Sequence, residues 1–482
     1  MLLATYLLFL NFNAKRLGGD KEVRSLKENC NFGFGLIAYA VMAVILLGAS
    51  PRTSGNHGIV TSDLDRSVKP GDNFYQFANG EWLKRTVIPP DRASVSVFSI
   101  LDDIAQKRTS DLIQEIAKSK ASAGSGTYKI AALYNSYMDE ATIDTKGLAP
   151  LKPHLDEIAK ISDKQQLARA LGETLRADVD ALNNTNFHTS NIFGLWVAPD
   201  FNDSDHYTAY LMQGGLALPD REYYLSEDEH MRDLRTRYQA HVATMFKLAN
   251  LSDAEMRAAS VFKLEHAIAE KHWTLAEDQD VHKANNPWIR SDFTTKASGL
   301  DWNEYFSGAG LAHQSKFIVW QPSALTGESA LVASAPLEDW KNLLAFHLIE
   351  DYAGVLPKAL SDEWFEFFGK TLTGTAEQRP RQQRAVIMTD ALLGDEVGKL
   401  YAERYFSSQA KARAQAMVAN IIAAFHKRVE ALAWMTPQTK GEALKKLGSL
   451  YVGIGYPENW HEYRSEERRV GKECRSRWSP YH

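Results

Sequence analysis

One cluster of this chain, formed by His266, Glu270 and His272, has residue types that can bind a metal ion. Glu270 follows His266 by four positions, so the two side chains would share one face of a helix. His272 stands six positions after His266 and would point to a different side of that helix. We therefore predict that this cluster is not a metal site, because its three candidate ligands do not converge on one ion.

The remaining residues form no other reactive arrangement. The sequence has no Gly-x-Ser-x-Gly turn, no Cys–His pair and no glycine-rich phosphate loop. Its other histidines are scattered, and a lone histidine is usually a surface residue or a hydrogen-bonded core residue. The residues alone thus indicate no catalytic, cofactor-binding or metal-binding site.

The elements that would have to position any site are mainly helical. Residues 94–119 carry apolar side chains at spacings of three and four, which predicts an amphipathic helix of several turns. The helical period returns in five further stretches, at residues 128–139, 256–273, 337–354, 362–369 and 409–434.

An aromatic stretch begins at the Pro-Gly pair 70–71, and Asp72 or Asn73 can cap a new helix there. The pair Asn-Gly at 79–80 suits a helix end or a tight turn, so Trp82 belongs either to this helix or to a following turn. We expect one apolar face, docked on a core and formed by Phe74, Phe77, Ala78 and Trp82.

One region breaks the helical pattern. Residues 191–199 and 206–213 are rich in aromatic and branched side chains, and a turn-forming cluster at 200–205 separates them. These features predict a β-hairpin. The phrase Gln-Gly-Gly-Leu-Ala-Leu-Pro-Asp-Arg-Glu-Tyr-Tyr-Leu follows at residues 213–225.

Composition limits the classes of protein that fit. A chain of 482 residues with 44% hydrophobic and 24% charged residues is globular and long enough for two domains. The net charge of −5 and the pI near 6.3 give no reason to expect nucleic-acid binding. Cys30 and Cys474 are the only cysteines, so residues 51–463 can form no internal disulfide.

Residues 1–50 are expected to be a signal peptide or a signal anchor. Three basic residues at positions 21–27 precede an uncharged run whose apolar core is residues 32–47. The sequence Leu-Gly-Ala at 47–49 is a poor cleavage site, and the uncharged run is just long enough to span a bilayer. These features favour a retained membrane anchor, with the remainder on the periplasmic or extracellular side.

The chain changes character after Tyr463. Residues 464–482 have no apolar periodicity and resemble the in-frame translation of a short-read sequencing adapter. A natural basic tail is the alternative. We therefore expect residues 63–463 to form the native domain and residues 464–482 to be an artefactual tail.

Several spaced blocks within residues 63–463 resemble the neprilysin-like zinc metallopeptidases, the family of neprilysin, endothelin-converting enzyme and the bacterial PepO oligopeptidases. Residues 133–139, 213–225 and 434–460 of this chain resemble sequence motifs of that family. The opening signature of the family is matched by Asp65, Pro70, Asp72, Phe74, Tyr75, Phe77, Gly80 and Trp82. Gly71 and Asn79 stand where many animal members have cysteine, which resembles the bacterial branch.

The resemblance implies a mainly α fold: a multi-helix ectodomain with a small β-hairpin, forming the N-terminal portion of a two-domain gluzincin-type metallopeptidase. It also implies a zinc metalloendopeptidase that hydrolyses peptide bonds of oligopeptides or proteins. Peptides would then be its substrates and zinc its cofactor.

The zinc motif of that family is missing from this chain. Family members hold zinc with two histidines of a His-Glu-x-x-His helix and a glutamate of a later helix, leaving one position for water. Here the pair His461-Glu462 is followed by Tyr463 and residues 464–465, so the second histidine is absent. We therefore expect a fragment that ends before the zinc motif, binds no zinc, and is inactive without a C-terminal catalytic half.

One departure from the family bears on specificity. In neprilysin, arginines shortly after an Ile-Pro loop meet the carboxylate end of a bound peptide. After Pro89 in this chain, Ser94 and Asp102 match those arginines. A carboxylate clamp needs cationic donors, so an endopeptidase preference is expected, although Arg92 is close by and leaves the alternative open.

A function of another class also fits the residues: a membrane-anchored helical binding module without enzymatic activity. The two hypotheses differ in what should cover the helix predicted at residues 409–434. A fragment of a larger enzyme would leave part of its apolar stripe in water, and that stripe consists of Met417, Ile421, Ile422, Phe425, Val429 and Leu432.

Overall fold

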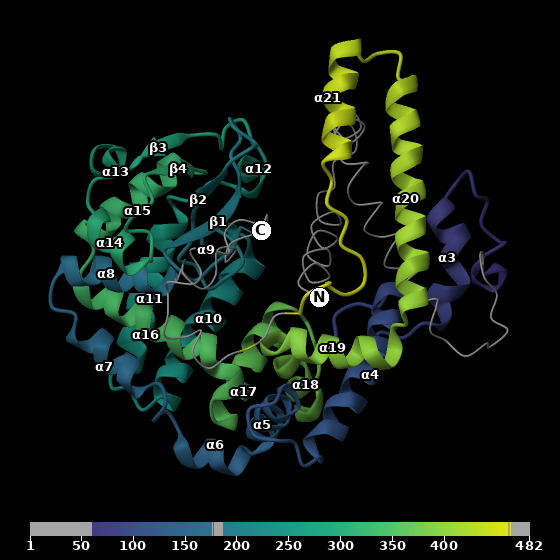
Figure 1. Ribbon diagram of the computed structural model, residues 1–482. Helices are drawn as coiled ribbons and strands as arrows, with labels where there is room; N and C mark the ends of the chain where they lie inside the picture. The colour runs from purple at the N-terminus through teal and green to yellow at the C-terminus, as the bar shows by residue number, and fades with distance from the viewer. Residues whose placement is uncertain (1–59, 176, 178–186, 461–462, 464–482) are drawn as a thin grey trace. The chain divides into compact units, whose positions relative to one another are not determined.

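The computed structural model describes residues 60–175, 177, 187–460 and 463. These residues form two compact units: one contains the chain up to Met138 and again from Arg379, and the other contains Asp139–Gln378 (Figure 1). The expected anchor at 1–50, the pair His461-Glu462 and the tail at 464–482 lie outside the described residues. No helix within the described ranges is both long and apolar enough to cross a membrane.

The unit formed by Asp139–Gln378, here called the central unit, is mostly helical. Its helices are α6 (Glu140–Lys146), α7 (Lys152–Lys160), α8 (Lys164–Leu175), α9 (Glu222–Leu225), α10 (Glu229–Leu248), α11 (Ala254–Ala269), α12 (Leu275–Asp278), α13 (Arg290–Lys296), α14 (Trp302–Gly308), α15 (Pro322–Ser334), α16 (Leu337–Tyr352) and α17 (Lys358–Trp364), with the 3-10 helix η3 (Ala353–Val355) and the π-helix η4 (Phe365–Leu372).

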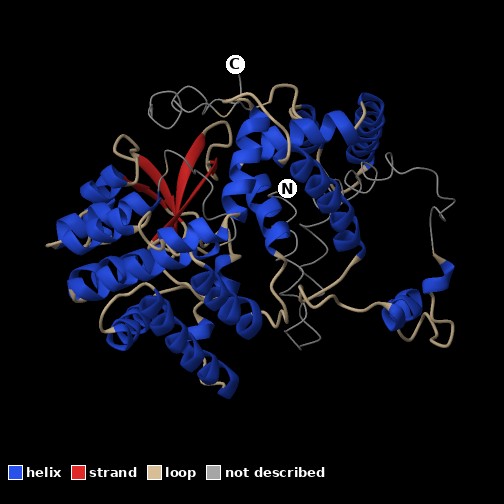
Figure 2. Cartoon of the chain, turned by 90° about the horizontal axis from the view of Figure 1, so that it is seen from below, coloured by secondary structure: helices blue, strands red, loops and turns tan. Residues whose placement is uncertain are grey.

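A small sheet lies among these helices, shown in red in Figure 2. Its four strands have the order β1-β2-β4-β3, and they are β1 (Phe193–Pro199), β2 (Tyr207–Gln213), β3 (Pro287–Ile289) and β4 (Lys316–Val319). Strands β1 and β2 form the predicted antiparallel hairpin, with Phe193 opposite Gln213. Strand β4 pairs parallel with β2 and antiparallel with β3. The sequence did not predict β3 and β4, because strands of three or four residues are too short to show an alternating pattern.

The two faces of this sheet contact different groups of side chains. Leu211 and Ala209 of β2 belong to the main apolar core, which the surrounding helices complete. Helices α8 and α15 lie beside the strands (Figure 1). Tyr210 and Met212 point to the other face and pack with Trp320, as expected for a strand whose side chains alternate.

The other unit, here called the outer unit, consists of two separate stretches of chain. Its elements are η2 (Thr61–Asp63), α3 (Phe74–Arg85), α4 (Val97–Ala117), α5 (Gly126–Met138), α18 (Arg381–Leu392), α19 (Gly394–Tyr405), α20 (Ser408–Ala431) and α21 (Pro437–Gly448). The helices predicted at 94–119, 128–139 and 409–434 are confirmed. A small core joins α4, α5, α18 and α19, and it includes Ile113, Ile130, Tyr134, Val386 and Val397.

Helix α3 corrects one expectation. The helix continues through Trp82 to Arg85, so Trp82 belongs to the helix and not to a following turn. Among the residues that the structure describes, no apolar core includes its aromatic face, since Phe74 is 68% exposed and Gly80 is the buried residue of this helix. Helical spacing shows that apolar residues share a face, but it does not show that another element covers them.

Candidate functional site

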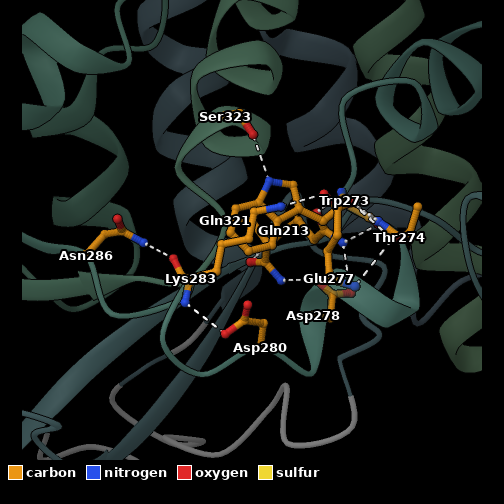
Figure 3. A network of polar contacts seen from close by, with 10 residues as sticks. All are labelled: Gln213, Trp273, Thr274, Glu277, Asp278, Asp280, Lys283, Asn286, Gln321 and Ser323. Carbon is orange, nitrogen blue, oxygen red and sulfur yellow. Dashed lines mark hydrogen bonds and ion pairs between the residues drawn. The ribbon is translucent and has the colours of Figure 1, made fainter. Parts of the chain in front are cut away.

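A buried network of polar contacts in the central unit surrounds Gln213, the last residue of β2 (Figure 3). The backbone N–H of Gln213 donates to Gln321 Oε1 at 3.0 Å, and its side-chain Oε1 accepts from the backbone N–H of Trp273 at 2.7 Å. Gln213 Nε2 donates to Asp278 Oδ2 at 3.3 Å, and Gln321 Nε2 donates to Asp278 Oδ1 at 2.8 Å. We call these four residues the Gln213 network.

Each glutamine in the network has a fixed orientation. Both amide oxygens accept a backbone N–H, so both amide nitrogens must face the carboxylate of Asp278. Asp278 is 2% exposed, and this burial raises its pKa to about 7. Gln213 Nε2 also donates to the carbonyl oxygen of Trp273 at 3.4 Å. The network therefore ties β2, α12 and the start of α15 together through buried hydrogen bonds.

Further polar contacts stabilise the short helix α12, which carries Asp278. Thr274 and Glu277 form a capping box at the start of α12. Lys283 Nζ donates to Glu277 Oε1 at 2.5 Å, and this bond is the main reason why the pKa of Glu277 is lowered to about 2. Lys283 also lies 4.3 Å from the ring centre of Trp273, whose Nε1 donates to Ser323 Oγ at 2.7 Å.

The structure explains why glycine occupies positions 214 and 215 in the segment 213–225. A Cβ at Gly214 would lie 2.2 Å from the carbonyl oxygen of Asn191, which is too close for any side chain. Gly215 has φ +87°, a backbone conformation that favours glycine. The carbonyl oxygen of Gly214 accepts a hydrogen bond from His272 Nε2 at 2.9 Å. Only glycine allows the chain to turn here directly against the hairpin.

A buried carboxylate accepts a hydrogen bond from the backbone of the next part of the segment 213–225. Glu265 of α11 is fully buried, and its Oε1 accepts from the backbone N–H of Ala217 at 3.2 Å and lies 2.9 Å from His347 Nε2. Its Oε2 accepts from the hydroxyl of Tyr238 at 2.7 Å. The hydroxyl of Tyr224 in turn accepts from the backbone N–H of Leu218 at 3.1 Å. Glu265 thus connects α10, α11 and α16 to this segment.

The histidines that the sequence placed close together are separated in the structure. His266 Nδ1 lies 3.7 Å from Glu270 Oε1 at the partly exposed side of α11. His272 is buried, which lowers its pKa to about 3, and its Nε2 lies 3.2 Å from Oε1 of Glu328. Burial also raises the pKa of Glu328 well above its ordinary value. Across residues 60–460, apart from the gaps around 176–186, no three His, Cys, Asp or Glu side chains are grouped to hold a metal ion.

These arrangements can position a backbone segment, but they contain no activated nucleophile among the described residues. The sequence alone did not single out Asp278, Gln321 or Glu265, because they lie in segments without a recognisable motif. Glu265 left one signal: it stands beside Leu264 and between Val261 and Ile268 on the apolar face of its helix, where a carboxylate needs a buried partner.

The segment after Pro89 contains a small group of charges in the outer unit. Arg92 Nε lies 3.2 Å from Asp91 Oδ1, and Arg92 NH1 lies 3.1 Å from Asp103 Oδ2. Ser94 and Asp102, which match the family arginines, are exposed. The guanidinium of Arg92 is therefore already paired with two carboxylates of its own chain.

Helix α20 is packed over its first half only. Ala414 and Val418 are buried, and Lys411 is 8% exposed beneath Tyr456. None of the residues from Ile421 to the end of α20 is buried, and Phe425 is 37% exposed. The stripe predicted from the sequence therefore exists, but its second half has no full cover among the described residues.

Comparison with known proteins explains the repeated family phrases. Residues 70–457 match the model of the N-terminal region of peptidase family M13. Endothelin-converting enzyme-like 1 of Mus musculus is 24% identical over 83% of this chain and 52% of that protein. Human neprilysin is 25% identical over 82% of this chain and 55% of that protein.

Solved structures agree with this match. The zinc metalloprotease Zmp1 of Mycobacterium tuberculosis, solved with an inhibitor, is 33% identical with a TM-score of 0.74, over 84% of this chain and 60% of that one. PepO of Lactobacillus rhamnosis, at 21% identity and a TM-score of 0.66, shares the fold over 82% of this chain and 61% of its own. The chain spans about half the length of the curated relatives it matches. This chain belongs to peptidase family M13, and it carries the N-terminal portion of that family.

Proposed function

We propose that this chain is the N-terminal part of an exported zinc metalloendopeptidase that hydrolyses peptide bonds in oligopeptides or proteins. The observation that carries the proposal is the M13 match over residues 70–457. The likeness to a zinc metalloprotease at a TM-score of 0.74 supports the same assignment. The matched relatives are longer than this chain, so the proposed activity is that of a larger molecule of which this is one part.

The described residues do not fit a zinc site. A catalytic zinc needs three protein ligands converging on one ion, whereas His266 and His272 turn to different environments. We propose that the zinc ligands belong to a C-terminal half and that this chain alone is inactive. The described residues would then form the mostly non-catalytic part of the enzyme.

The charges after Pro89 support a preference for internal peptide bonds. Arg92 is paired with Asp91 and Asp103, and Ser94 and Asp102 carry no positive charge. A free peptide carboxylate would have to displace an existing ion pair to reach Arg92. Peptides with an amidated C-terminus should therefore be cleaved with the same kcat/KM as peptides with a free carboxylate.

The exposed half of α20 supports a missing partner. Burial of apolar surface contributes roughly 25 cal/mol per Å², so a few large side chains left in water cost several kcal/mol. We propose that a C-terminal half covers Phe425 and its neighbours on α20. We also propose that residues 1–50 direct export and that residues 464–482 are not part of the domain.

A fusion protein tests the proposed function. Residues 60–460 would be joined to the C-terminal remainder of the M. tuberculosis protease, and cleavage of an internally quenched peptide would be measured. We expect cleavage by the fusion that a chelator abolishes and zinc restores, with no cleavage by this chain or by the remainder alone.

Two results would contradict the proposal. Stoichiometric zinc and chelator-sensitive cleavage in this chain alone would show that it holds its own active site. An inactive but folded fusion, together with a monodisperse chain that binds no hydrophobic dye, would favour the non-enzymatic binding module.

A further inference from the structure

A small cavity of the central unit lies beside the Gln213 network. Its lining residues come from three segments, 187–189, 213–221 and 272–278. Gln213, Trp273 and Asp278, drawn in Figure 3, are among them. The cavity leaves about 20 Å³ for the centre of a water molecule, and about 10–15 Å³ of such space is enough to hold one. The space therefore fits a single water-sized occupant.

His188 lines this cavity and has a polar atom without a partner. Its Nε2 is buried and makes no hydrogen bond with the described residues. Burial lowers the pKa of His188 below its ordinary value, so the ring is neutral at physiological pH, with one nitrogen as donor and the other as acceptor. In either role, an unpaired buried Nε2 costs free energy. A partner that can both donate and accept would satisfy it whichever nitrogen carries the proton.

Two charged residues at the cavity have further capacity for hydrogen bonds. The carboxylate of Asp278 accepts two amide N–H groups of the Gln213 network, whereas a carboxylate can accept about four hydrogen bonds. Arg221 donates through Nε to a backbone carbonyl oxygen and through NH1 to a neighbouring carboxylate. A guanidinium carries more N–H groups than these two contacts use. The cavity therefore offers an acceptor and a donor in addition to His188.

We propose that this cavity binds one water molecule, which hydrogen-bonds to His188 Nε2, donates to the Asp278 carboxylate and accepts from the Arg221 guanidinium. Buried waters typically make about three hydrogen bonds to polar groups of the protein, and these three residues supply that number. The water would connect the stretch before β1, the segment 213–225 and helix α12. The site lies within the central unit, so it does not depend on the proposed enzymatic function.

A water molecule fits the site better than a cation. The carboxylates of Asp220 and Asp278 would attract a cation, but the guanidinium of Arg221 lines the same cavity and would repel it. A cation also cannot accept a hydrogen bond from Arg221. Within the described ranges, no three His, Cys, Asp or Glu side chains are grouped to hold a metal ion.

The test compares three single substitutions with the unaltered full chain. His188→Phe removes both ring nitrogens, whereas His188→Gln keeps a polar amide at the same position. The control is His154→Phe, which changes an exposed histidine of α7 in the same unit. Water-oxygen magnetic relaxation dispersion counts the long-lived internal waters, and urea unfolding measures stability.

We expect His188→Phe to lose one long-lived water and to raise the equilibrium constant for unfolding about tenfold, the usual cost when a buried polar group loses its partner. His188→Gln should keep the water, and the control should match the unaltered chain in both measurements. Nitrogen NMR of selectively labelled histidine provides a measurement that needs no variant to fold. It should show a hydrogen bond at His188 Nε2 in the unaltered chain.

Three results would overturn the inference. An equal number of long-lived waters in His188→Phe and the unaltered chain, or a more stable His188→Phe, would show that Nε2 binds no water. A histidine spectrum without a hydrogen bond at His188 Nε2 would show the same. A Tm that rises in ammonium chloride but not in sodium chloride of equal ionic strength, and only when His188 is present, would identify a cation as the occupant.

Discussion

At the scale of single residues, Gly80 and Asp65 form one contact between two parts of the opening signature. A Cβ at Gly80 would lie 2.5 Å from Asp65 Cβ, and the backbone N–H of Asp65 donates to the carbonyl oxygen of Phe77 at 2.8 Å. The hydroxyl of Ser67 and then Lys84 Nζ donate to the Asp65 carboxylate, and they hold its pKa at about 2. The signature therefore records a packing requirement of α3.

Replacement of Gly80 by alanine tests this contact. Alanine in a helix interior usually stabilises by about 0.5–1 kcal/mol relative to glycine, but overpacking at this site should cost about 1–3 kcal/mol. We expect faster hydrogen exchange of the Asp65 amide in Gly80→Ala. Gly441→Ala in α21 is the matched control, because nothing lies within 4 Å of its new Cβ, and it should be neutral or stabilising. Unchanged exchange at Asp65 would contradict the argument.

Asp278 and His272 should respond to pH in opposite directions. Burial raises the pKa of Asp278 from 3.8 to about 7, so its contribution to the free energy of unfolding is largest below about pH 4 and falls as the pH rises to about 7. Burial lowers the pKa of His272 from 6.5 to about 3, so its contribution is complete above about pH 6.5 and is lost on acidification. Between about pH 4 and pH 6.5 the two slopes offset each other.

Two variants separate these slopes. Asp278→Asn removes the acid-favouring term, so its free energy of unfolding should fall more steeply than that of the unaltered chain between pH 6.5 and pH 4. His272→Gln removes the opposing term, so its stability should instead rise on acidification over the same range. Urea unfolding at several pH values measures both slopes, and parallel curves for the three proteins would refute the assignment.

At the scale of elements, Glu265 connects three helices to the segment that follows β2. Its carboxylate accepts hydrogen bonds from the Ala217 N–H and the Tyr238 hydroxyl and contacts His347 Nε2. Replacement of the carboxylate by an amide would place an N–H donor against these buried donors. We expect Glu265→Gln to lower the free energy of unfolding by about 1–3 kcal/mol, the cost of unsatisfied buried polar groups.

Glu255→Gln is the control for that change, because Glu255 lies on the same helix but is exposed and forms a surface ion pair with Lys247. Exposed ion pairs contribute about 0–1 kcal/mol, so this variant should unfold close to the unaltered chain. Equal losses for the two variants would show that Glu265 contributes no more than a surface carboxylate.

At the scale of the whole molecule, the two units differ in how completely they bury their apolar residues. The central unit is one continuous stretch of chain around a large core that includes Trp302, Trp340 and Phe346. The outer unit has a smaller core, and several of its large apolar side chains, such as Phe74 and Trp434, are mostly exposed.

This difference predicts different behaviour in solution. Residues 139–378 alone should be a monomer with one sharp urea transition and no binding of a hydrophobic dye. Residues 51–463 should bind the dye or aggregate, and fusion to a catalytic half should restore a monomer without dye binding. Size exclusion, dye fluorescence and urea melting check this. If residues 139–378 bound as much dye as the longer chain, the exposed apolar surface would lie in the central unit, which would contradict the prediction.

The sequence by itself determined several of the helices, the hairpin and the family. Helical spacing at residues 94–119 and 409–434, and the turn cluster at 200–205, act between neighbours in the chain, so local patterns report them. The family phrases at 65–82 and 213–225 are long enough to be specific, and the match over residues 70–457 confirms them.

Tertiary structure alone decided which residues meet and which faces are covered. Gln213, Asp278 and Gln321 come together from separate segments, and strands β3 and β4 exist through their pairing with β2 and with each other. No periodicity encodes such contacts, because their partners are distant in the chain. Spacing likewise gave Phe74 and Phe425 an apolar face, but their exposure depends on which other elements are present to bury them.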